Sequence, residues 1–158
     1  MTASIRLQPG DLAPEFVLAD QFDSPVARDD LQGTKSIIYF YPEADTPGCT
    51  TQACDFEENM GVFEKAGYRV IGISRDAVDK LKRFADGRGL HFTLLSDPDH
   101  AVHDAYGAYG EKLLYGKTVI SAIRSTFVLD EGCRIVHALY NVKATGHIAM
   151  LRKKLKLT

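Results

Sequence analysis

Apolar and polar positions alternate along the chain in blocks that predict strands and helices in turn. Short apolar runs rich in β-forming residues predict buried strands, and apolar residues that recur every three or four positions predict amphipathic helices. The predicted strands span residues 36–42, 68–74 and 92–97, and the predicted helices span residues 50–65, 78–86 and 147–155, with a short helix after Pro98. This alternation is typical of βαβ units, in which helices cover both faces of a parallel sheet.

The two ends of the chain add strands to this sheet. Residues 125–130 and 134–140 flank the turn Glu131-Gly132 and predict a hairpin, which makes the sheet mixed. The segment before Leu31 predicts an additional strand pair. We therefore expect an α/β fold with a central mixed sheet flanked by helices. The length of 158 residues predicts a single domain over residues 1–158.

Composition and charge exclude several classes of protein. Hydrophobic residues make up 45% and charged residues 25% of the chain, which excludes a disordered or fibrous protein. The 19 basic and 21 acidic residues leave a net charge of −2, so no basic field attracts nucleic acid or an anionic membrane. The longest apolar or aromatic run, residues 37–41, is far too short to cross a membrane, and the N-terminus lacks a signal-peptide core. We expect a cytoplasmic protein that binds neither nucleic acid nor membranes.

The cysteines suggest catalysis, metal binding or no chemical role at all. Three cysteines in a reducing compartment are too few for a disulfide framework. Cys49 follows a predicted strand, and Thr46 and Pro47 suit the N-cap and the first position of a helix. Free backbone N–H groups and the helix dipole stabilise a thiolate there, so we expect the pKa of Cys49 to lie well below ~8.5.

The helical period also places Cys49 beside the core. Ala53, Phe56, Met60 and Phe63 share one face of the predicted helix, and Cys49 is the preceding member of that series. A lone cysteine in an apolar stripe is more often an inert buried residue than a reactive one. The strand end, the Thr-Pro-Gly sequence and the helix start together favour a reactive thiol at the mouth of the core.

These residues carry a resemblance to a known family. Pro42, Thr46 and Cys49 match the Pro-x-x-x-Thr-x-x-Cys signature of peroxiredoxins, and the block FYPEADTPGCTTQACDF resembles the bacterioferritin comigratory protein or PrxQ branch. The similarity continues through VIGIS, LLSDPD, YGK and IRSTFVLDEGCRIV to VKATGH. The chain departs from the branch at Gln52, where glutamate is frequent, at Glu57-Glu58, where Arg-Asp is frequent, and at Tyr106, where tryptophan is common. The resemblance implies a thioredoxin-like fold and a thiol peroxidase that reduces hydrogen peroxide and organic hydroperoxides.

The resemblance also implies roles for individual residues. Cys49 is the expected peroxidatic cysteine, Cys54 the resolving cysteine of the same chain, and Arg124 the active-site arginine. A lower thiol pKa also lowers nucleophilicity, so most of the rate must come from stabilisation of charge that moves across the O–O bond. Arg124 supplies a fixed positive charge and Thr46 a hydroxyl that donates and accepts. Pro42 has no N–H and can shield the thiolate from water.

The resemblance further implies a catalytic cycle and the partners that it needs. A peroxide converts Cys49 to a sulfenic acid, Cys54 condenses with it to a disulfide, and a thioredoxin-type dithiol protein restores both thiols. We expect a monomer without cofactor or metal, because the spacing of Cys49 and Cys54 does not suit a metal site and His100 and His103 suggest a solvated first helical turn. Cys133 is expected to be an incidental thiol that its turn can leave exposed.

Two other function classes stay open at this point. A general thiol-disulfide oxidoreductase of the same fold usually has Cys-x-x-Cys at the helix start, which this chain lacks. A thioredoxin-like copper chaperone needs two closely spaced cysteines on the helix-start loop and a distant histidine. Cys54 lies too far along the helix for that site, and Thr46 and Arg124 would then have no role. Peroxide consumption with and without a dithiol, and metal content after purification, distinguish the three classes.

Overall fold

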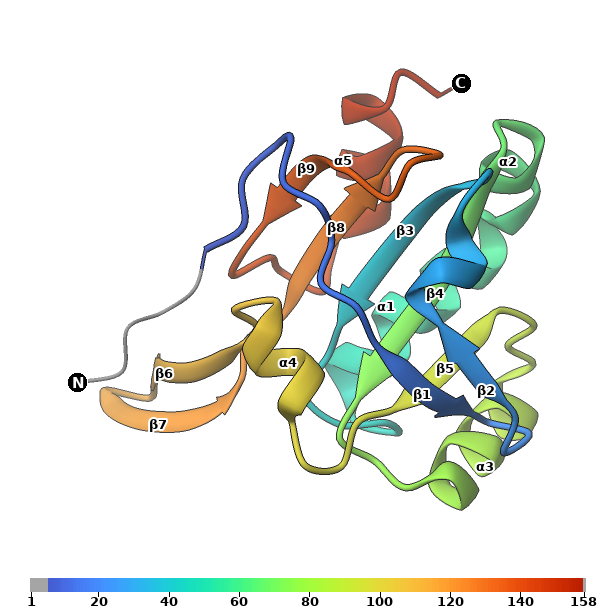
Figure 1. The fold of residues 1–158 in the computed structure, drawn as a ribbon. Helices are drawn as coiled ribbons and strands as arrows, with labels where there is room; N and C mark the ends of the chain where they lie inside the picture. The colour runs from blue at the N-terminus through green and yellow to red at the C-terminus, as the bar shows by residue number, and fades with distance from the viewer. Residues whose placement is uncertain (1–5, 158) are drawn as a thin grey trace.

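A seven-stranded sheet lies at the centre of the computed structural model, which describes residues 6–157 (Figure 1). The strands follow in the order β2-β1-β5-β4-β3-β8-β9, with β3, β4 and β5 parallel and the other neighbouring pairs antiparallel. They span β1 (Val17–Asp20), β2 (Pro25–Ala27), β3 (Lys35–Phe40), β4 (Tyr68–Ser74), β5 (Thr93–Ser96), β8 (Ser125–Leu129) and β9 (Ile135–Leu139). The mixed sheet, its N-terminal strand pair and its closing hairpin confirm the prediction from sequence.

Helices cover both faces of this sheet. They span α1 (Pro47–Glu58), α2 (Met60–Lys65), α3 (Val78–Arg88), α4 (Ala101–Ala105) and α5 (His147–Lys154), and a 3-10 helix spans Arg28–Leu31. Buried side chains of α1, α2, α3 and α5 form one hydrophobic cluster with the sheet. Those of α4 and the 3-10 helix belong to a second cluster, with β1, β2 and the segment before them. We call these the α1 cluster and the N-terminal cluster.

The central strand β3 is apolar or aromatic from Ile37 to Phe40 because both of its faces are buried there. Ile37 and Tyr39 belong to the α1 cluster, whereas Ile38 and Phe40 belong to the N-terminal cluster. A strand without a solvent-facing side has no need for alternating polar residues. Its carboxyl end leads the chain directly to the start of α1.

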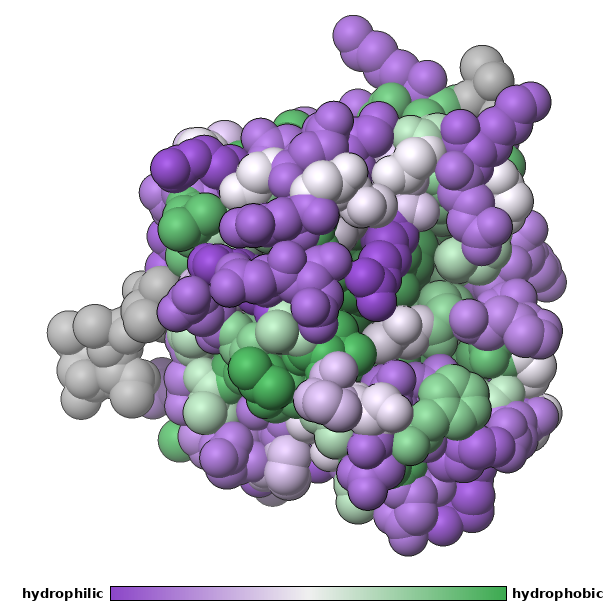
Figure 2. Space-filling view, turned by 45° about the vertical axis from the view of Figure 1, so that its right-hand side comes forward, coloured by the Kyte–Doolittle hydropathy of each residue, from purple (hydrophilic) through white to green (hydrophobic). Residues whose placement is uncertain are grey.

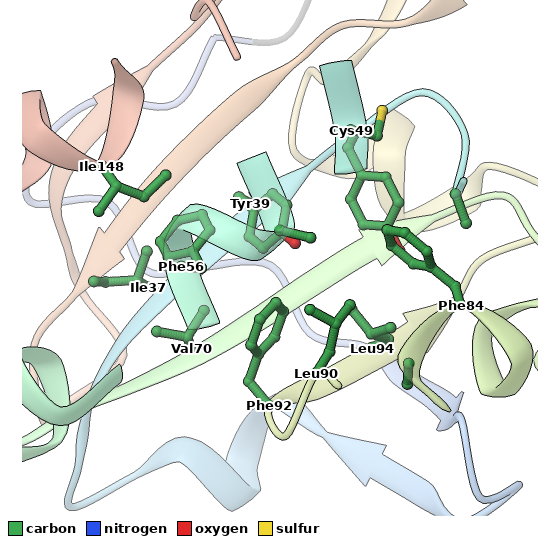
Figure 3. Packing of buried hydrophobic residues seen from close by; sticks show 14 of the residues in the cluster. Ile37, Tyr39, Cys49, Phe56, Val70, Phe84, Leu90, Phe92, Leu94 and Ile148 are labelled. Atoms are coloured by element: carbon green, nitrogen blue, oxygen red, sulfur yellow. The ribbon is translucent and has the colours of Figure 1, made fainter. Parts of the chain in front are cut away.

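Aromatic side chains form much of the α1 cluster (Figure 3). The rings of Tyr39 and Phe56 stack with their centroids 4.6 Å apart, which joins α1 to β3. A Cβ atom on Gly72 would stand 2.9 Å from the Tyr39 ring, so β4 passes too close for any larger residue. Cys49 lies at the margin of this cluster, at the first turn of α1.

Two elements differ from the prediction. The helix expected over residues 50–65 is interrupted at Asn59, whose side chain donates a hydrogen bond to the Asp55 carbonyl at 2.8 Å and so competes with the backbone pattern. A hairpin of β6 (Tyr109–Leu114) and β7 (Lys117–Ala122) was not predicted, and it projects from the sheet in Figure 1. Its turn residues Tyr115 and Gly116 both have positive φ, where Asn-Gly or Asp-Gly is the usual signal.

Hydrophilic side chains cover most of the face of the molecule that Figure 2 shows. Hydrophobic atoms are visible between them. Most phenylalanines belong to the two buried clusters, whereas Phe22 is 67% exposed. None of the helices within residues 6–157 has the length and apolar character needed to cross a membrane.

Candidate active site

The loop between β3 and α1 sets the position of the first helical turn. The Tyr41 N–H donates to the Ile73 carbonyl at 3.1 Å, which extends the pairing of β3 and β4 by one residue before the half-buried Pro42. Thr46 occupies the N-cap position of α1 by its backbone, as predicted. Its hydroxyl does not cap the helix, however, because it donates to the Glu43 carbonyl at 2.7 Å. The loop therefore folds back on itself before the helix begins.

A carboxylate that sequence reasoning missed braces the same loop. Asp76 accepts hydrogen bonds from the Ala44 N–H and the Ser74 hydroxyl, each at 2.7 Å, and only 8% of its side chain is exposed. The Lys80 ammonium lies 3.2 Å from Asp76 and 2.7 Å from Glu43. These contacts tie the loop to the end of β4 and to α3. The sequence holds no signal for the bond between Asp76 and the loop, because Asp76 lies 32 residues from Ala44.

The structure brings together the two residues on which the predicted chemistry most depends. Cys49 is the third residue of α1 and is 2% exposed, in one cluster with Ala53 and Phe56 as predicted. The Arg124 guanidinium reaches it from the loop between β7 and β8, with Nη2 3.4 Å from the Cys49 Sγ. A Cβ atom on Gly48 would stand 3.3 Å from the same nitrogen, so a small residue before Cys49 leaves room for the guanidinium.

The other end of the guanidinium contacts Gln52, which stands where glutamate is frequent in the resembling branch. Arg124 Nη1 donates to Oε1 of Gln52 at 2.6 Å, and Gln52 is fully buried one helical turn after Cys49. Within residues 6–157, Arg124 forms no salt bridge. The spacing of three residues, which places Cys49 and Gln52 on one side of the helix, was the available signal for this contact.

Two further basic side chains, Lys112 and His147, lie near Arg124. Lys112 of β6 donates to the Ala122 carbonyl at 3.1 Å, and burial lowers its pKa, with repulsion from Arg124 in the same direction and attraction to Cys49 in the opposite one. Burial, followed by the charge of Arg124, lowers the pKa of His147 to about 4, and its ring lies 2.8 Å from the Thr126 hydroxyl. His147 is therefore neutral at neutral pH. Lys112 was missed because the hairpin that carries it was not predicted.

Cys54 lies on α1 with Cys49 but does not meet it. Both thiols are free, and Cys54 is half-buried in the second turn. In a regular helix, residues five positions apart point about 140° apart, with Cα atoms about 8.6 Å from each other. A disulfide accepts roughly 4.4–6.8 Å between Cα atoms. The folded helix therefore keeps the two sulfur atoms apart.

Two expectations about other residues were wrong. Cys133 is fully buried rather than exposed, because its turn packs into the N-terminal cluster, where its Sγ lies 3.7 Å from the Arg28 carbonyl oxygen. His103 is not solvated: it is fully buried, 2.7 Å from the Asp97 carboxylate, whereas His100 pairs with Asp104 at the surface. Over the described range 6–157, no group of three or more His, Cys, Asp or Glu side chains could hold a metal ion.

Comparisons with known proteins identify the family of the chain. The family model described as AhpC/TSA matches residues 9–138. A Mycobacterium tuberculosis protein with peroxiredoxin in its name is 57% identical over 157 residues, which cover 99% of this chain and all of that protein. Peroxiredoxin Bcp of Escherichia coli K12 is 46% identical over 141 residues, 89% of this chain and 90% of the relative.

Solved structures show the same fold. A cysteine variant of PrxQ from Xylella fastidiosa superposes with a TM-score of 0.89 at 31% identity, over 96% of this chain and 97% of that one. The bacterioferritin comigratory protein of Xanthomonas campestris, known for alkyl peroxide reduction activity, gives a TM-score of 0.83 at 36% identity, over 89% and 90% of the two chains.

Fold, cysteine setting and relatives together define a thiol-dependent peroxidase on a thioredoxin-like scaffold. The chain belongs to the AhpC/TSA family, in the branch of the peroxiredoxins Bcp and PrxQ. Membership in this family carries with it peroxide substrates and a thiol reductant.

Proposed function

We propose that Cys49 is the peroxidatic residue of this peroxidase. Its thiolate attacks one oxygen of the hydroperoxide, the O–O bond breaks, and Cys49 keeps that oxygen as a sulfenic acid while water or an alcohol leaves after protonation. The observation that carries this assignment is the contact of 3.4 Å between the Cys49 Sγ and the Arg124 guanidinium at the start of a helix. The positive charge of Arg124 stabilises both the thiolate and the negative charge that develops on the oxygens.

Thr46 and Pro42 complete the proposed site. Because the Thr46 hydroxyl hydrogen is donated to the Glu43 carbonyl, the lone pairs of Oγ1 are what Thr46 offers to a bound peroxide. Thr46 would therefore accept a hydrogen bond from the hydroperoxide O–H and orient the oxygen that Cys49 attacks. Pro42 offers no N–H at the mouth of the site, so it limits the polar contacts that would hold water there.

Cys54 is the proposed resolving residue. Its thiolate attacks the sulfenic sulfur of Cys49, the S–O bond breaks as the disulfide forms, and the sulfenic oxygen leaves as hydroxide, which takes up a proton to become water. Since the regular helix keeps the two residues apart, the first turns of α1 must unwind for this step. Unwinding also brings the disulfide to the surface, where a thioredoxin-type dithiol protein of the cytoplasm would reduce it. Both cysteines belong to one chain, so the cycle runs in a monomer.

Intact-mass measurement after one equivalent of peroxide tests these roles. The unmodified protein should lose the mass of two hydrogens as the disulfide forms, and the Cys54→Ser variant should instead gain one oxygen. The Cys49→Ser variant should show neither change, and Cys133→Ser, the matched control, should behave like the unmodified protein. Oxidation of Cys49→Ser by one equivalent of peroxide would contradict the assignment. The X. campestris relative makes alkyl hydroperoxides the substrate class to test beside hydrogen peroxide.

A further inference from the structure

We propose that Gln52 is a positioning residue of the peroxidase reaction, which holds Arg124 in place without compensating its charge. This inference depends on the proposed role of Cys49. The guanidinium donates through Nη1 to Gln52 Oε1 at 2.6 Å and through Nη2 to Cys49 Sγ at 3.4 Å. Both partners belong to α1, one turn apart, so the two ends of the guanidinium are directed at one side of the same helix.

A second arginine in the chain shows what charge compensation looks like. Arg28 Nη2 lies 2.6 Å from the Asp29 carboxylate and 3.3 Å from that of Glu15. Arg124 has no such carboxylate partner within residues 6–157, and its oxygen acceptor is the neutral amide of Gln52. An amide oxygen orients a guanidinium by hydrogen bonding, whereas a carboxylate would also cancel most of the field that it exerts on a nearby sulfur.

The burial of Gln52 lowers the stability of the fold. It is fully buried, and its Nε2 is buried without a hydrogen-bond partner within the described range. Because the facing guanidinium nitrogens are donors only, Oε1 must face Arg124 and Nε2 must point away. An unpaired buried amide is unfavourable. The contact with Arg124 is the only hydrogen bond that the Gln52 side chain makes with residues 6–157, and it accounts for the presence of a polar residue here.

The substitution Gln52→Glu tests the role of charge, because it keeps the size and the acceptor and adds one negative charge. The guanidinium at hydrogen-bond distance keeps the introduced carboxylate ionised. In a Cys54→Ser background, the pH midpoint of Cys49 alkylation should move up by about one unit. The rate of sulfenic acid formation on the high-pH plateau should fall on the order of tenfold, less than when a donor is removed altogether.

The substitution Gln52→Met tests the role of position. It removes the hydrogen-bond acceptor, so Arg124 stays charged but is no longer held in place. The rate of sulfenic acid formation on the high-pH plateau should fall, while the pH midpoint of Cys49 alkylation should move less than in Gln52→Glu. The matched control is Gln21→Glu, a second buried glutamine, whose side chain bonds the main chain of Phe92 and Leu94 instead of Arg124. Gln21→Glu also buries a charge, so it should lower the thermal stability without moving the Cys49 midpoint.

An unchanged midpoint in Gln52→Glu would overturn the proposal, as would an equal shift in Gln21→Glu. Cys49→Ser in the same assay separates this from a failure of the proposed function. If Cys49→Ser abolishes sulfenic acid formation while Gln52→Glu matches the parent protein, only the role of Gln52 is wrong. If Cys49→Ser still forms a sulfenic acid, the assignment of the peroxidatic residue is wrong.

Discussion

Two buried thiols lie in the hydrophobic clusters on the two faces of the sheet, and each has an arginine close by. Cys49 belongs to the α1 cluster and is 2% exposed, whereas Cys133 belongs to the N-terminal cluster and is 0% exposed. Burial raises the pKa of Cys133, and the charge of Arg28 opposes that shift only in part. Burial and a nearby arginine therefore do not by themselves make a reactive thiol.

The two sites differ in what surrounds each arginine. Arg28 is paired with Asp29 and Glu15, and the negative charge of Asp29 acts on the pKa of Cys133 against the charge of Arg28. Arg124 faces the Cys49 sulfur directly and has a neutral amide as its other partner. Cys49 also lies in the first turn of a helix, whereas Cys133 lies in a turn with φ of 61° between two strands. An uncompensated cation together with a helix start is what distinguishes the proposed catalytic thiol.

Exchange of each thiol for a hydroxyl is the most severe test of this comparison. Cys49→Ser should abolish peroxide reduction, because no other thiol in the described part of the chain lies at a helix start. Cys133→Ser should leave turnover unchanged at neutral pH, since burial keeps that thiol protonated. Coupled peroxide consumption with a dithiol reductant measures both. A large loss in Cys133→Ser would show that this thiol takes part in the cycle.

Removal of the arginine should have the next largest effect. Arg124→Ala should slow the reaction of Cys49 with peroxide by on the order of 10²-fold or more, as loss of a preorganised donor does. The alkylation midpoint of Cys49 should also move to higher pH. Rapid-mixing kinetics across the pH range separate the two effects. If the midpoint moves but the plateau rate does not fall, Arg124 promotes ionisation only and does not stabilise the transition state.

Thr46 should matter less, because it acts on the substrate through one neutral hydrogen bond. Thr46→Val should lower the rate with peroxide by about tenfold, which corresponds to a hydrogen bond worth about 1.4 kcal/mol. Thr46→Ser keeps the hydroxyl and should retain most of the rate. Single-turnover measurements on both variants test this assignment, and equal rates in Thr46→Val and the parent protein would remove Thr46 from the site.

The second turn of α1 offers a test of the resolving step. Cys54→Ser should leave the first reaction with peroxide intact but make Cys49 sensitive to over-oxidation. Without a resolving thiol, the sulfenic acid persists until a second peroxide oxidises it to a sulfinic acid. Mass spectrometry after repeated peroxide additions measures the sulfinic product. In the parent protein, hydrogen exchange over residues 48–58 should be faster in the disulfide form than in the reduced form. Equal protection in the two forms, with the disulfide confirmed by mass, would exclude unwinding of α1.

The smallest effect concerns stability rather than turnover. The pKa of His147 is lowered from 6.5 to about 4, so the unfolded chain binds a proton there before the folded protein does. The free energy of unfolding should therefore fall as the pH drops from 6.5 to about 4, by on the order of 3 kcal/mol at most. Denaturant titrations of the parent protein and His147→Gln measure this, and the variant should lose that part of the slope. An identical slope in both would show that other groups cause it.

Local patterns in the sequence determined the elements and the position of Cys49. The apolar run of β3, the N-cap position of Thr46 and the helical period after Cys49 depend only on residues near one another, so the strand, the helix start and the buried face could be read directly. The same is true of the hairpin around Glu131-Gly132. The turn at Tyr115 and Gly116 escaped prediction because tyrosine rarely takes a positive φ.

Tertiary structure decided which charges meet. The placement of Arg124 on Cys49 had to come from a family resemblance, because 75 residues separate them, and its contact with Gln52 was not foreseen. Cys133 was misjudged for the same reason: a turn next to Glu131-Gly132 indicates exposure locally, but the packing of the N-terminal segment buries it. Burial and charge compensation depend on residues distant in sequence, and no local pattern records which of them come into contact.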